Sequence, residues 1–157
     1  IKNKAHFIDG ELNGEVISYS ENGNIIEKVF MKGKLLNGDA FAYYPNGKLK
    51  EKDSFKNGKS EGESIIYYEN GNVKQKSTFK NDKREGDLFI YYPSGKLLQK
   101  RSFINGKAEG ELVEYYENGV IKEKAYFIND KQEKEHFFYD EKGKLIKTDI
   151  YKNGVKQ

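Results

Sequence analysis

A row of acidic residues recurs every 24 positions, and it is the first pattern in this chain that could do chemistry. Its members are Glu15, Asp39, Glu63, Asp87, Glu111 and Glu135. Two carboxylates can hydrolyse a glycosidic bond when they lie about 5 to 10 Å apart. Copies that lie two strands apart in a sheet would be separated by about 10 Å, at the limit of that range. A repeated residue also has no unique partner, so we expect these acids to pair with nearby lysines.

Other patterns that could support catalysis are incomplete. His6 and His136 lie near opposite ends of the chain, where we expect solvated strand residues too far apart to share a metal ion. The stretch Asn-Gly-Lys-Ser at residues 57–60 imitates the end of a phosphate-binding loop, but Asp53 replaces the earlier glycine that such a loop needs. The chain has no cysteine, which excludes a thiolate nucleophile and a disulfide. The sequence therefore predicts no catalytic residue, no metal site and no cofactor.

Composition and charge limit the classes of partner. The 157 residues include 28 basic and 25 acidic side chains, for a net charge of +3, and this mixture does not predict nucleic-acid binding. No apolar run approaches 18 residues, so no membrane-spanning helix is expected. The mean hydropathy of −0.91 is typical of a disordered chain, but ten phenylalanines and twelve tyrosines supply apolar area. We therefore expect a folded chain with a thin core in which the aromatic side chains are buried.

Internal repetition organises the whole sequence. A glycine precedes the acid at positions 14, 38, 62, 86 and 110, and a second glycine and a tyrosine recur with the same period of 24. Each unit closes with an aromatic residue, and only the first interval of this series is 25; the series is Phe30, Phe55, Phe79, Phe103, Phe127 and Tyr151. We predict one array over residues 1–157, with repeats that begin at 14, 38, 62, 86, 110 and 134. Residues 1–13 match the last strand and turn of a preceding unit.

Each unit has the pattern of a β-hairpin. Asn-Gly between apolar runs is a strong hairpin signal, and Pro45 with Gly47 fits a type I turn followed by a G1 bulge. We expect the same turn at Asn57-Gly58. Between turns the apolar residues alternate with period two. An isolated hairpin is marginal in water, so the sequence predicts an all-β fold. It is an elongated, single-layer, twisted antiparallel meander of stacked hairpins, with about 13 strands in six 24-residue repeats.

The alternation predicts two different sheet faces. The first carries an aromatic row, Phe41, Tyr43, Tyr67, Phe89, Tyr91 and Tyr115. The opposite face carries a basic row, Lys50, Lys52, Lys74, Lys76, Lys122 and Lys124. Because exposed apolar patches of several hundred Å² are rare without a function, the aromatic row is our candidate surface for a protein partner or a second copy. The basic row is either a solvated face or a surface that docks anionic lipid head groups or an acidic protein surface.

The repeated motif resembles the MORN-repeat superfamily, specifically its bacterial type 2, or YwqK-like, variant. That variant has Tyr-Tyr-x-Asn-Gly-Lys followed by an aromatic-x-Asn-Gly-Lys segment, which match here at Tyr43–Lys59, Tyr67–Lys83, Tyr91–Lys107 and Tyr115–Lys131. The first copy departs from it at Ser20, and the last at Lys134 and Asp140. The resemblance implies an elongated hairpin array that binds or scaffolds. MORN arrays are linked to protein partners, to self-association and to phospholipid head groups, and YwqK-like proteins are often labelled antitoxins.

We interpret the chain as a non-enzymatic scaffold for protein–protein interaction, including interaction with a second copy to form a homodimer. One alternative is a membrane-binding or cell-surface module that contacts anionic lipid or carbohydrate. Choline-binding repeats use tryptophan cages, and this chain has no tryptophan. Another alternative is an antitoxin or immunity protein of the YwqK-like type. A start at Ile1 instead of methionine is typical of a processed or trimmed piece of a longer array. It favours a secreted or cell-envelope location while leaving the cytoplasm open.

Overall fold

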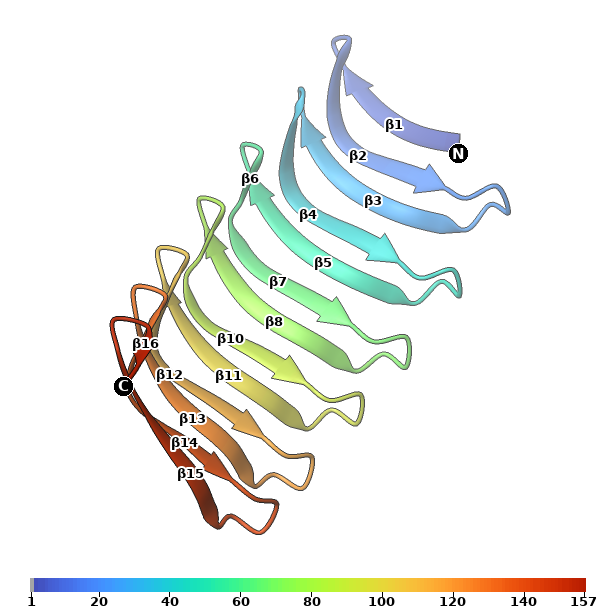
Figure 1. Ribbon diagram of the computed structural model, residues 1–157. Coiled ribbons are helices and arrows are strands. Elements are labelled where there is room, and N and C mark those ends of the chain that lie inside the picture. The colour runs from blue at the N-terminus through green and yellow to red at the C-terminus, as the bar shows by residue number, and fades with distance from the viewer. Residues whose placement is uncertain (1) are drawn as a thin grey trace.

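The computed structural model describes residues 2–157 as one open antiparallel sheet in which successive strands lie side by side (Figure 1). The strands are β1 (Lys2–Ile8), β2 (Glu11–Tyr19), β3 (Ile25–Lys32), β4 (Leu35–Tyr43), β5 (Leu49–Lys56), β6 (Lys59–Ser60), β7 (Gly62–Tyr67), β8 (Val73–Lys80), β9 (Lys83–Arg84), β10 (Gly86–Tyr91), β11 (Leu97–Ile104), β12 (Lys107–Tyr115), β13 (Ile121–Ile128), β14 (Lys131–Tyr139), β15 (Leu145–Lys152) and β16 (Val155–Lys156). The predicted single-layer meander of stacked hairpins is confirmed. The expectation that concerns Ile1 lies outside the described residues.

Short segments raise the strand count to sixteen, against the predicted number of about 13. β6 and β9 pair with β5 and β8 but are separated from β7 and β10 by one residue each. At the first break, Glu61 N donates to Ser54 O at 2.9 Å. At the second break, Glu85 N donates to Thr78 O at the same distance. The strand is thus bent at these points but remains in the sheet. Residues 2–157 contain no helix that is long and apolar enough to cross a membrane.

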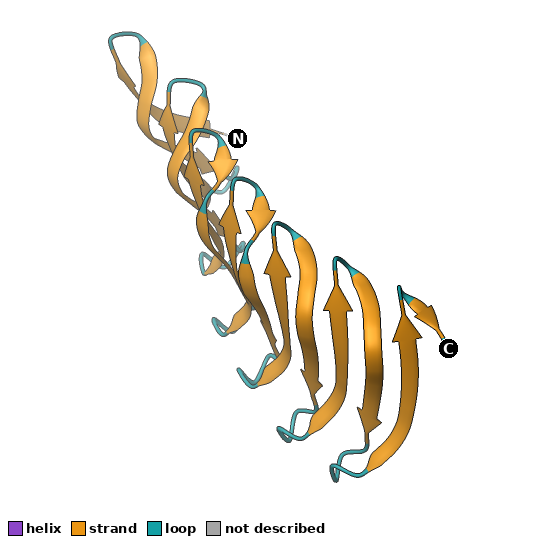
Figure 2. Cartoon of the chain, turned by 90° about the vertical axis from the view of Figure 1, so that its left-hand side faces the viewer, coloured by secondary structure: helices purple, strands orange, loops and turns teal. Residues whose placement is uncertain are grey.

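Two kinds of turn close the hairpins, one along each long edge of the sheet (Figure 2). The wide turns match the prediction, because Gly47 alone has a positive φ, of 81°, and its N–H donates to Tyr44 O at 2.9 Å. The narrow turns have only two residues, and our expectation of the same turn there was wrong. Asn57 and Gly58 both have positive φ, of 50° and 80°, which is the type I′ geometry. This turn follows the right-handed twist of the flanking strands.

Aspartate replaces glycine in two of the narrow turns without changing the turn. Asp82 and Asp130 have φ of 65° and 67°, in a region that aspartate tolerates better than most residues. The Oδ1 of Asp82 accepts a hydrogen bond from Ser60 N at 2.7 Å, and Asp130 accepts one from Ala108 N at the same distance. Each aspartate therefore also ties its turn to the preceding hairpin.

The strand register corrects the position of the first closing residue. Gly14 lies opposite Met31, as Gly38 lies opposite Phe55 in the next unit. Met31 therefore takes the place that we assigned to Phe30, which lies opposite Glu15 on the other face. The period is 24 here as well. The apparent interval of 25 came from choosing the nearest aromatic residue in place of the methionine.

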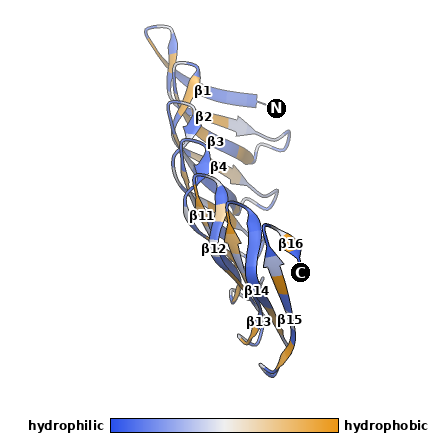
Figure 3. Cartoon of the chain, turned by 60° about the vertical axis from the view of Figure 1, so that its left-hand side comes forward, coloured by the Kyte–Doolittle hydropathy of each residue, from blue (hydrophilic) through white to orange (hydrophobic). Residues whose placement is uncertain are grey.

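The core is thin and made mainly of aliphatic side chains. The buried hydrophobic residues are Leu88, Ala108, Leu112, Val113 and Ala125. No phenylalanine or tyrosine among residues 2–157 reaches the same burial, so our expectation of buried aromatic side chains was wrong in degree. Figure 3 shows hydrophobic and hydrophilic segments mixed along the strands, without a continuous apolar layer. A sheet with no second layer leaves its larger side chains half-buried.

Four of the five buried hydrophobic residues lie on one face of the sheet, whereas Val113 lies on the other, opposite Lys100 and Lys124. Leu112 lies opposite Arg101 on one side and Ala125 on the other, and Arg101 also lies opposite Leu88. Residues that lie directly opposite one another in a ladder project from the same face. We call the face that carries these residues the core face.

Lys134 occupies the backbone position that glycine takes in the five preceding repeats, and its φ is 65°. We expect Lys134→Gly to be more stable than Lys134→Ala by about 1 kcal/mol, because only glycine adopts positive φ without cost. Both variants lose the ammonium group that lies 3.5 Å from the Tyr126 ring centroid, so their difference isolates the backbone. Urea denaturation of the two variants measures it. Equal stabilities would contradict a strained backbone at this position.

Candidate interaction surfaces

The sequence predicts that the aromatic and basic rows lie on opposite faces of the sheet. This prediction is wrong. Lys52 lies opposite Phe41 on β4 and Ile65 on β7. Lys76 lies opposite Ile65 and Phe89, and Lys124 lies opposite Val113 and Phe137 in the same way. These lysines therefore alternate with apolar residues on one face, which we call the lysine face.

The other three lysines of the predicted basic row project differently, because each is the extra residue of a β-bulge. The register changes from Ala42↔Glu51 to Tyr43↔Leu49, which leaves Lys50 without an opposite residue, and Lys74 and Lys122 are skipped in the same way. Lys74 Nζ lies 5.7 Å from the Tyr68 ring, and Lys122 bonds Glu114 at 2.6 Å. A bulge reverses the alternation of a strand, so Lys50, Lys74 and Lys122 do not belong to the lysine face.

Four of the repeated acids form ion pairs on the lysine face with the lysine thirteen residues later. Lys52 Nζ lies 3.2 Å from Asp39, Lys76 2.5 Å from Glu63 and Lys100 2.8 Å from Asp87, and Lys28 pairs with Glu15. The expectation that these acids pair with nearby lysines is confirmed for these four units. Among residues 2–157, Glu111 and Glu135 form no such pair.

In two of these ion pairs, a serine hydroxyl also donates a hydrogen bond to the carboxylate and contributes to lowering its pKa. Ser54 Oγ donates to Asp39 at 2.7 Å and Ser102 Oγ donates to Asp87 at 2.6 Å. The Ser54 hydroxyl, with help from Lys52, lowers the pKa of Asp39. For Asp87, hydrogen bonds from Lys100 and Ser102 lower the pKa. The bond to Asp87 in turn raises the pKa of Lys100, so both members of this pair stay charged across the neutral range.

Asp87→Asn is expected to be less stable than the wild type at pH 7 by no more than about 1 kcal/mol, because the pair is half-exposed. The folded-state pKa of Asp87 is depressed, so its contribution is present above the unfolded pKa of about 3.9 and is lost as the pH falls through the folded value. The raised pKa of Lys100 preserves the pair below about pH 10.4 and loses it as the pH rises through the folded value. Urea denaturation from pH 2 to pH 7 measures the difference.

Glu111→Gln is the matched control, because Glu111 holds the equivalent position in the next unit without an ion pair among residues 2–157. Its stability should follow that of the wild type at every pH. The gap between Asp87→Asn and the wild type should close near pH 2 and shrink in 1 M salt. A gap that stays constant with pH would assign the effect of Asp87 to something other than its charge.

The predicted aromatic row is brought together on the lysine face. Phe41 has the Lys52 ammonium 5.9 Å from its ring centroid, and Phe89 has that of Lys100 at 5.7 Å. The hydrogen bond with Glu63 raises the pKa of Lys76, and Tyr91 on β10 and Tyr67 on β7 lie close enough to add to this effect. All six residues of the row are half-buried; they are Phe41, Tyr43, Tyr67, Phe89, Tyr91 and Tyr115.

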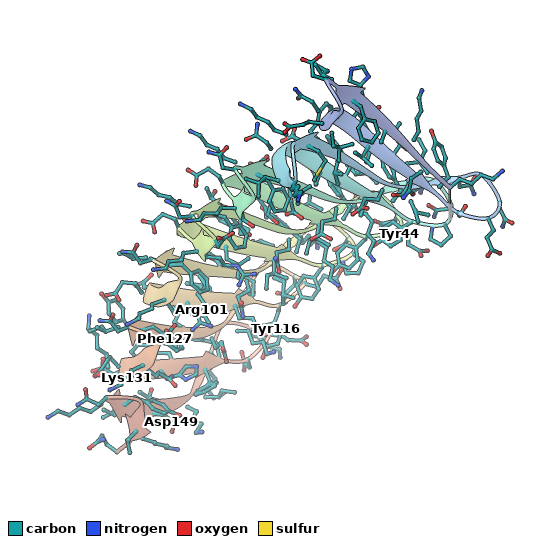
Figure 4. All side chains as sticks on the ribbon, turned by 90° about the horizontal axis from the view of Figure 1, so that it is seen from above. Tyr44, Arg101, Tyr116, Phe127, Lys131 and Asp149 are labelled. Carbon is teal, nitrogen blue, oxygen red and sulfur yellow. The ribbon has the colours of Figure 1, made fainter. Side chains whose placement is uncertain are left out.

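The second tyrosine of each Tyr-Tyr pair joins neighbouring hairpins, a role that the sequence analysis missed. The hydroxyls of Tyr44, Tyr68, Tyr92 and Tyr116 each donate to the backbone carbonyl of a tyrosine 23 residues later, at 2.6 to 2.9 Å. Figure 4 shows Tyr44 and Tyr116 along the same long side of the sheet. The sequence did contain a signal for this role. The second tyrosine recurs in the four central copies and is replaced only in the first copy, by Ser20, and in the last, by Asp140.

Side chains also join the hairpins along the edge with the narrow turns. The carboxylates of Glu61, Glu85, Glu109 and Glu133 accept a hydrogen bond from the backbone N–H of the asparagine 20 residues later, at 2.6 to 2.9 Å. Both long edges of the sheet are therefore tied from one unit to the next. These periodic bonds fix the position of each hairpin relative to the next along both edges.

Two arginines on the core face form a cluster that the sequence analysis did not anticipate. The guanidinium carbons of Arg84 and Arg101 lie 5.8 Å and 5.4 Å from the centroid of the Phe103 ring. Arg84 also lies 5.4 Å from the Phe79 centroid, and Arg101 lies 4.4 Å from that of Phe127 (Figure 4). Arginine occurs only at these two positions and is not periodic, so the repeat pattern gave no signal.

His136 is not the solvated residue that the sequence predicted. Its side chain is 13% exposed and stacks on Phe138 with a centroid distance of 4.0 Å. Its Nδ1 lies 2.6 Å from the Gln132 amide, and its Nε2 lies 3.5 Å from a Glu123 carboxylate oxygen. Residues 2–157 hold no group of three or more His, Asp or Glu side chains that could bind a metal ion.

Asp149 lies opposite His136 on the core face and is also paired. Its side chain is only 8% exposed, and its carboxylate contacts Lys147 Nζ at 2.6 Å and Lys156 Nζ at 2.8 Å. Hydrogen bonds from these two lysines lower the pKa of Asp149. The nearly buried charge of Asp149 is therefore balanced by the charges of two lysines.

The periodic hairpins, the ties between units and the two open faces define a repeat scaffold. The chain belongs to the MORN repeat variant family, whose sequence profile matches six consecutive segments at residues 12–32, 36–57, 60–81, 84–105, 108–129 and 132–153. The resemblance to the MORN-repeat superfamily that was drawn from the motifs is therefore confirmed. Among curated proteins, no sequence matches this chain. MORN repeats are generally non-enzymatic modules that are often involved in protein or membrane binding.

Proposed function

We propose that this chain is a non-enzymatic scaffold that binds a protein partner through the aromatic row of its lysine face. The observation that supports this is the half-burial of Phe41, Phe89 and the four tyrosines on a sheet whose described residues carry no second layer. Aromatic residues are enriched in protein interfaces, where they bury a large area at low entropic cost. The ties along both edges hold the row in place before binding, which reduces the ordering cost of association.

The charge on the lysine face favours a protein over an anionic membrane. Lys28, Lys52, Lys76 and Lys100 are each neutralised by a carboxylate of the preceding strand. Membrane attraction requires basic side chains whose charge is free to act on the lipid head groups. A face of alternating ion pairs and aromatic rings instead resembles the mixed surface of a protein interface.

Affinity capture from the native source with the intact array tests the proposal. We expect the wild type to recover a protein partner and the variant Tyr67→Ser/Tyr91→Ser to lose it while remaining folded, which circular dichroism would show. The control Ile104→Ser/Ile128→Ser removes exposed apolar side chains at the narrow turns and should keep the partner. Light scattering over a range of concentrations detects a second copy as the partner. Retention by the tyrosine variant, or turnover of a substrate, would refute the proposal.

A further inference from the structure

Arg84 and Arg101 lack the counter-charge that Asp149 and the paired lysines possess. Neither side chain forms an ion pair with any of residues 2–157, and both Nε atoms are buried without a hydrogen-bond partner. Glu85, which follows Arg84 in the sequence, already accepts a bond from Asn105 N at 2.8 Å. The two guanidinium groups therefore have unused donors on the same face of the sheet.

The surroundings of these arginines make the missing counter-charge costly. Arg101 lies between Leu88 and Leu112 in the two neighbouring strands, and these are only 8% and 7% exposed. Cations in apolar surroundings are destabilised unless they are paired. Stacking on aromatic rings compensates part of this cost but does not use the N–H donors. An anion from outside the chain would compensate the charge and accept hydrogen bonds from the outer N–H groups of these half-buried guanidinium groups.

The geometry points to a carboxylate ligand, and we propose that Arg84, Phe103 and Arg101 form a binding site for an acidic segment of a protein partner. The planar guanidinium binds a carboxylate through two parallel hydrogen bonds, which a point charge such as lysine does not reproduce. The two cations lie 5.8 Å and 5.4 Å from the centroid of the Phe103 ring, which would contact the aliphatic part of the bound segment. The site thus takes two acidic side chains with an apolar contact between them.

Burial of the cations favours a peptide over a membrane surface. A bilayer attracts basic groups that project beyond the protein surface, whereas both arginine side chains are half-buried and their Nε atoms are buried. An extended peptide can bring individual acidic side chains to these half-buried guanidinium groups. This inference depends on the proposed protein-binding function and adds a second contact, on the face opposite the aromatic row.

Nuclear magnetic resonance provides a direct test, because the chain has two arginines and therefore two Nε–Hε signals. The probe is hexaglutamate with blocked ends, added to the full chain at low salt. We expect both signals to shift and to saturate, and hexaglutamine to leave them unchanged. If the arginines serve only to stack on the phenylalanine rings, hexaglutamate will not move the signals, and that result would overturn the proposal.

Two double variants separate the planar geometry of the guanidinium groups from their positive charge. Arg84→Lys/Arg101→Lys keeps both positive charges and should raise the Kd for hexaglutamate by about tenfold, because the paired hydrogen bonds are lost. The control Lys83→Met/Lys107→Met removes two exposed charges from the same part of the sheet and should change the Kd by less than about twofold, as expected for exposed charges. A larger effect of the control would mean that the peptide binds nonspecifically, which would refute the site.

Further arms of the experiment test other ligands. Saturation of both arginine signals by inorganic phosphate or by phosphatidylserine vesicles, with no response to hexaglutamate, would overturn the choice of a carboxylate. Glu51 and Asp53 also lie on the core face, on β5, so a second copy could supply the carboxylates. A dimer that the arginine variant abolishes would therefore reject a separate partner. If the captured protein still binds the arginine variant, the scaffold function stands and this site does not.

Discussion

Leu112→Ala is expected to lower the free energy of unfolding by about 3 kcal/mol, because it removes one of the few buried side chains of the sheet. Leu112 is 7% exposed and lies between Arg101 and Ala125. Its loss removes apolar burial from both neighbouring strands and opens the region around Arg101. Urea denaturation followed by circular dichroism measures the change.

The exposed residue Ile128 provides a matched control for this prediction. It is an aliphatic residue of similar size on the neighbouring strand β13, and it is 42% exposed. Ile128→Ala should therefore cost less than about 1 kcal/mol, because little of its surface is buried on folding. Equal losses for the two variants would contradict a core that is concentrated on the core face.

The consequences of Leu112→Ala should also be local. Each hairpin contacts only its neighbours in the sheet, and in such arrays stability is a sum over units and their interfaces. Hydrogen exchange should therefore accelerate most in strands β11 to β13 and least in β2 and β3. Uniform acceleration along the chain would show that the array unfolds as a single cooperative unit.

The architecture could be predicted because one signal was repeated many times. Gly47 and its equivalents fix a turn every 24 residues, and the period-two alternation between turns has no competing interpretation as helix. Errors arose where a single residue breaks the regular pattern. The bulge at Lys50 reverses the strand alternation, so a count of residues from the turn places this side chain on the wrong face. At Met31, an aromatic neighbour concealed the residue that keeps the period.

The candidate sites were less predictable than the fold, for two different physical reasons. The tyrosine hydroxyls of the wide turns donate to carbonyls 23 residues away, in the next hairpin. These bonds could not be predicted from the sequence, because they depend on the distance between neighbouring hairpins in the folded sheet. Arg84 and Arg101 occupy different positions in their repeats but contact the same ring, Phe103. A search for periodic residues cannot find a site that depends on such an irregular pair.

Gly38→Ala is expected to destabilise the chain by about 3 kcal/mol, through backbone strain and overpacking together. Gly38 has a φ of 130°, which side-chain-bearing residues rarely adopt, and a Cβ at this position would lie 3.0 Å from the Phe30 Cβ. The contact involves the root of a side chain that is fixed to its backbone, so Phe30 cannot rotate away from it. Thermal and urea denaturation measure the loss.

Gly86→Ala separates the two causes, because Gly86 is the equivalent glycine two repeats later and a Cβ there would meet no atom within 4 Å. Its φ of 81° still penalises alanine, so the expected loss is about 1 kcal/mol, and the lower entropy of the unfolded alanine variant offsets part of it. The excess at Gly38 is then the steric contribution of Phe30. Since both glycines occupy the same place in the sequence repeat, equal losses would show that backbone conformation alone selects glycine at this position.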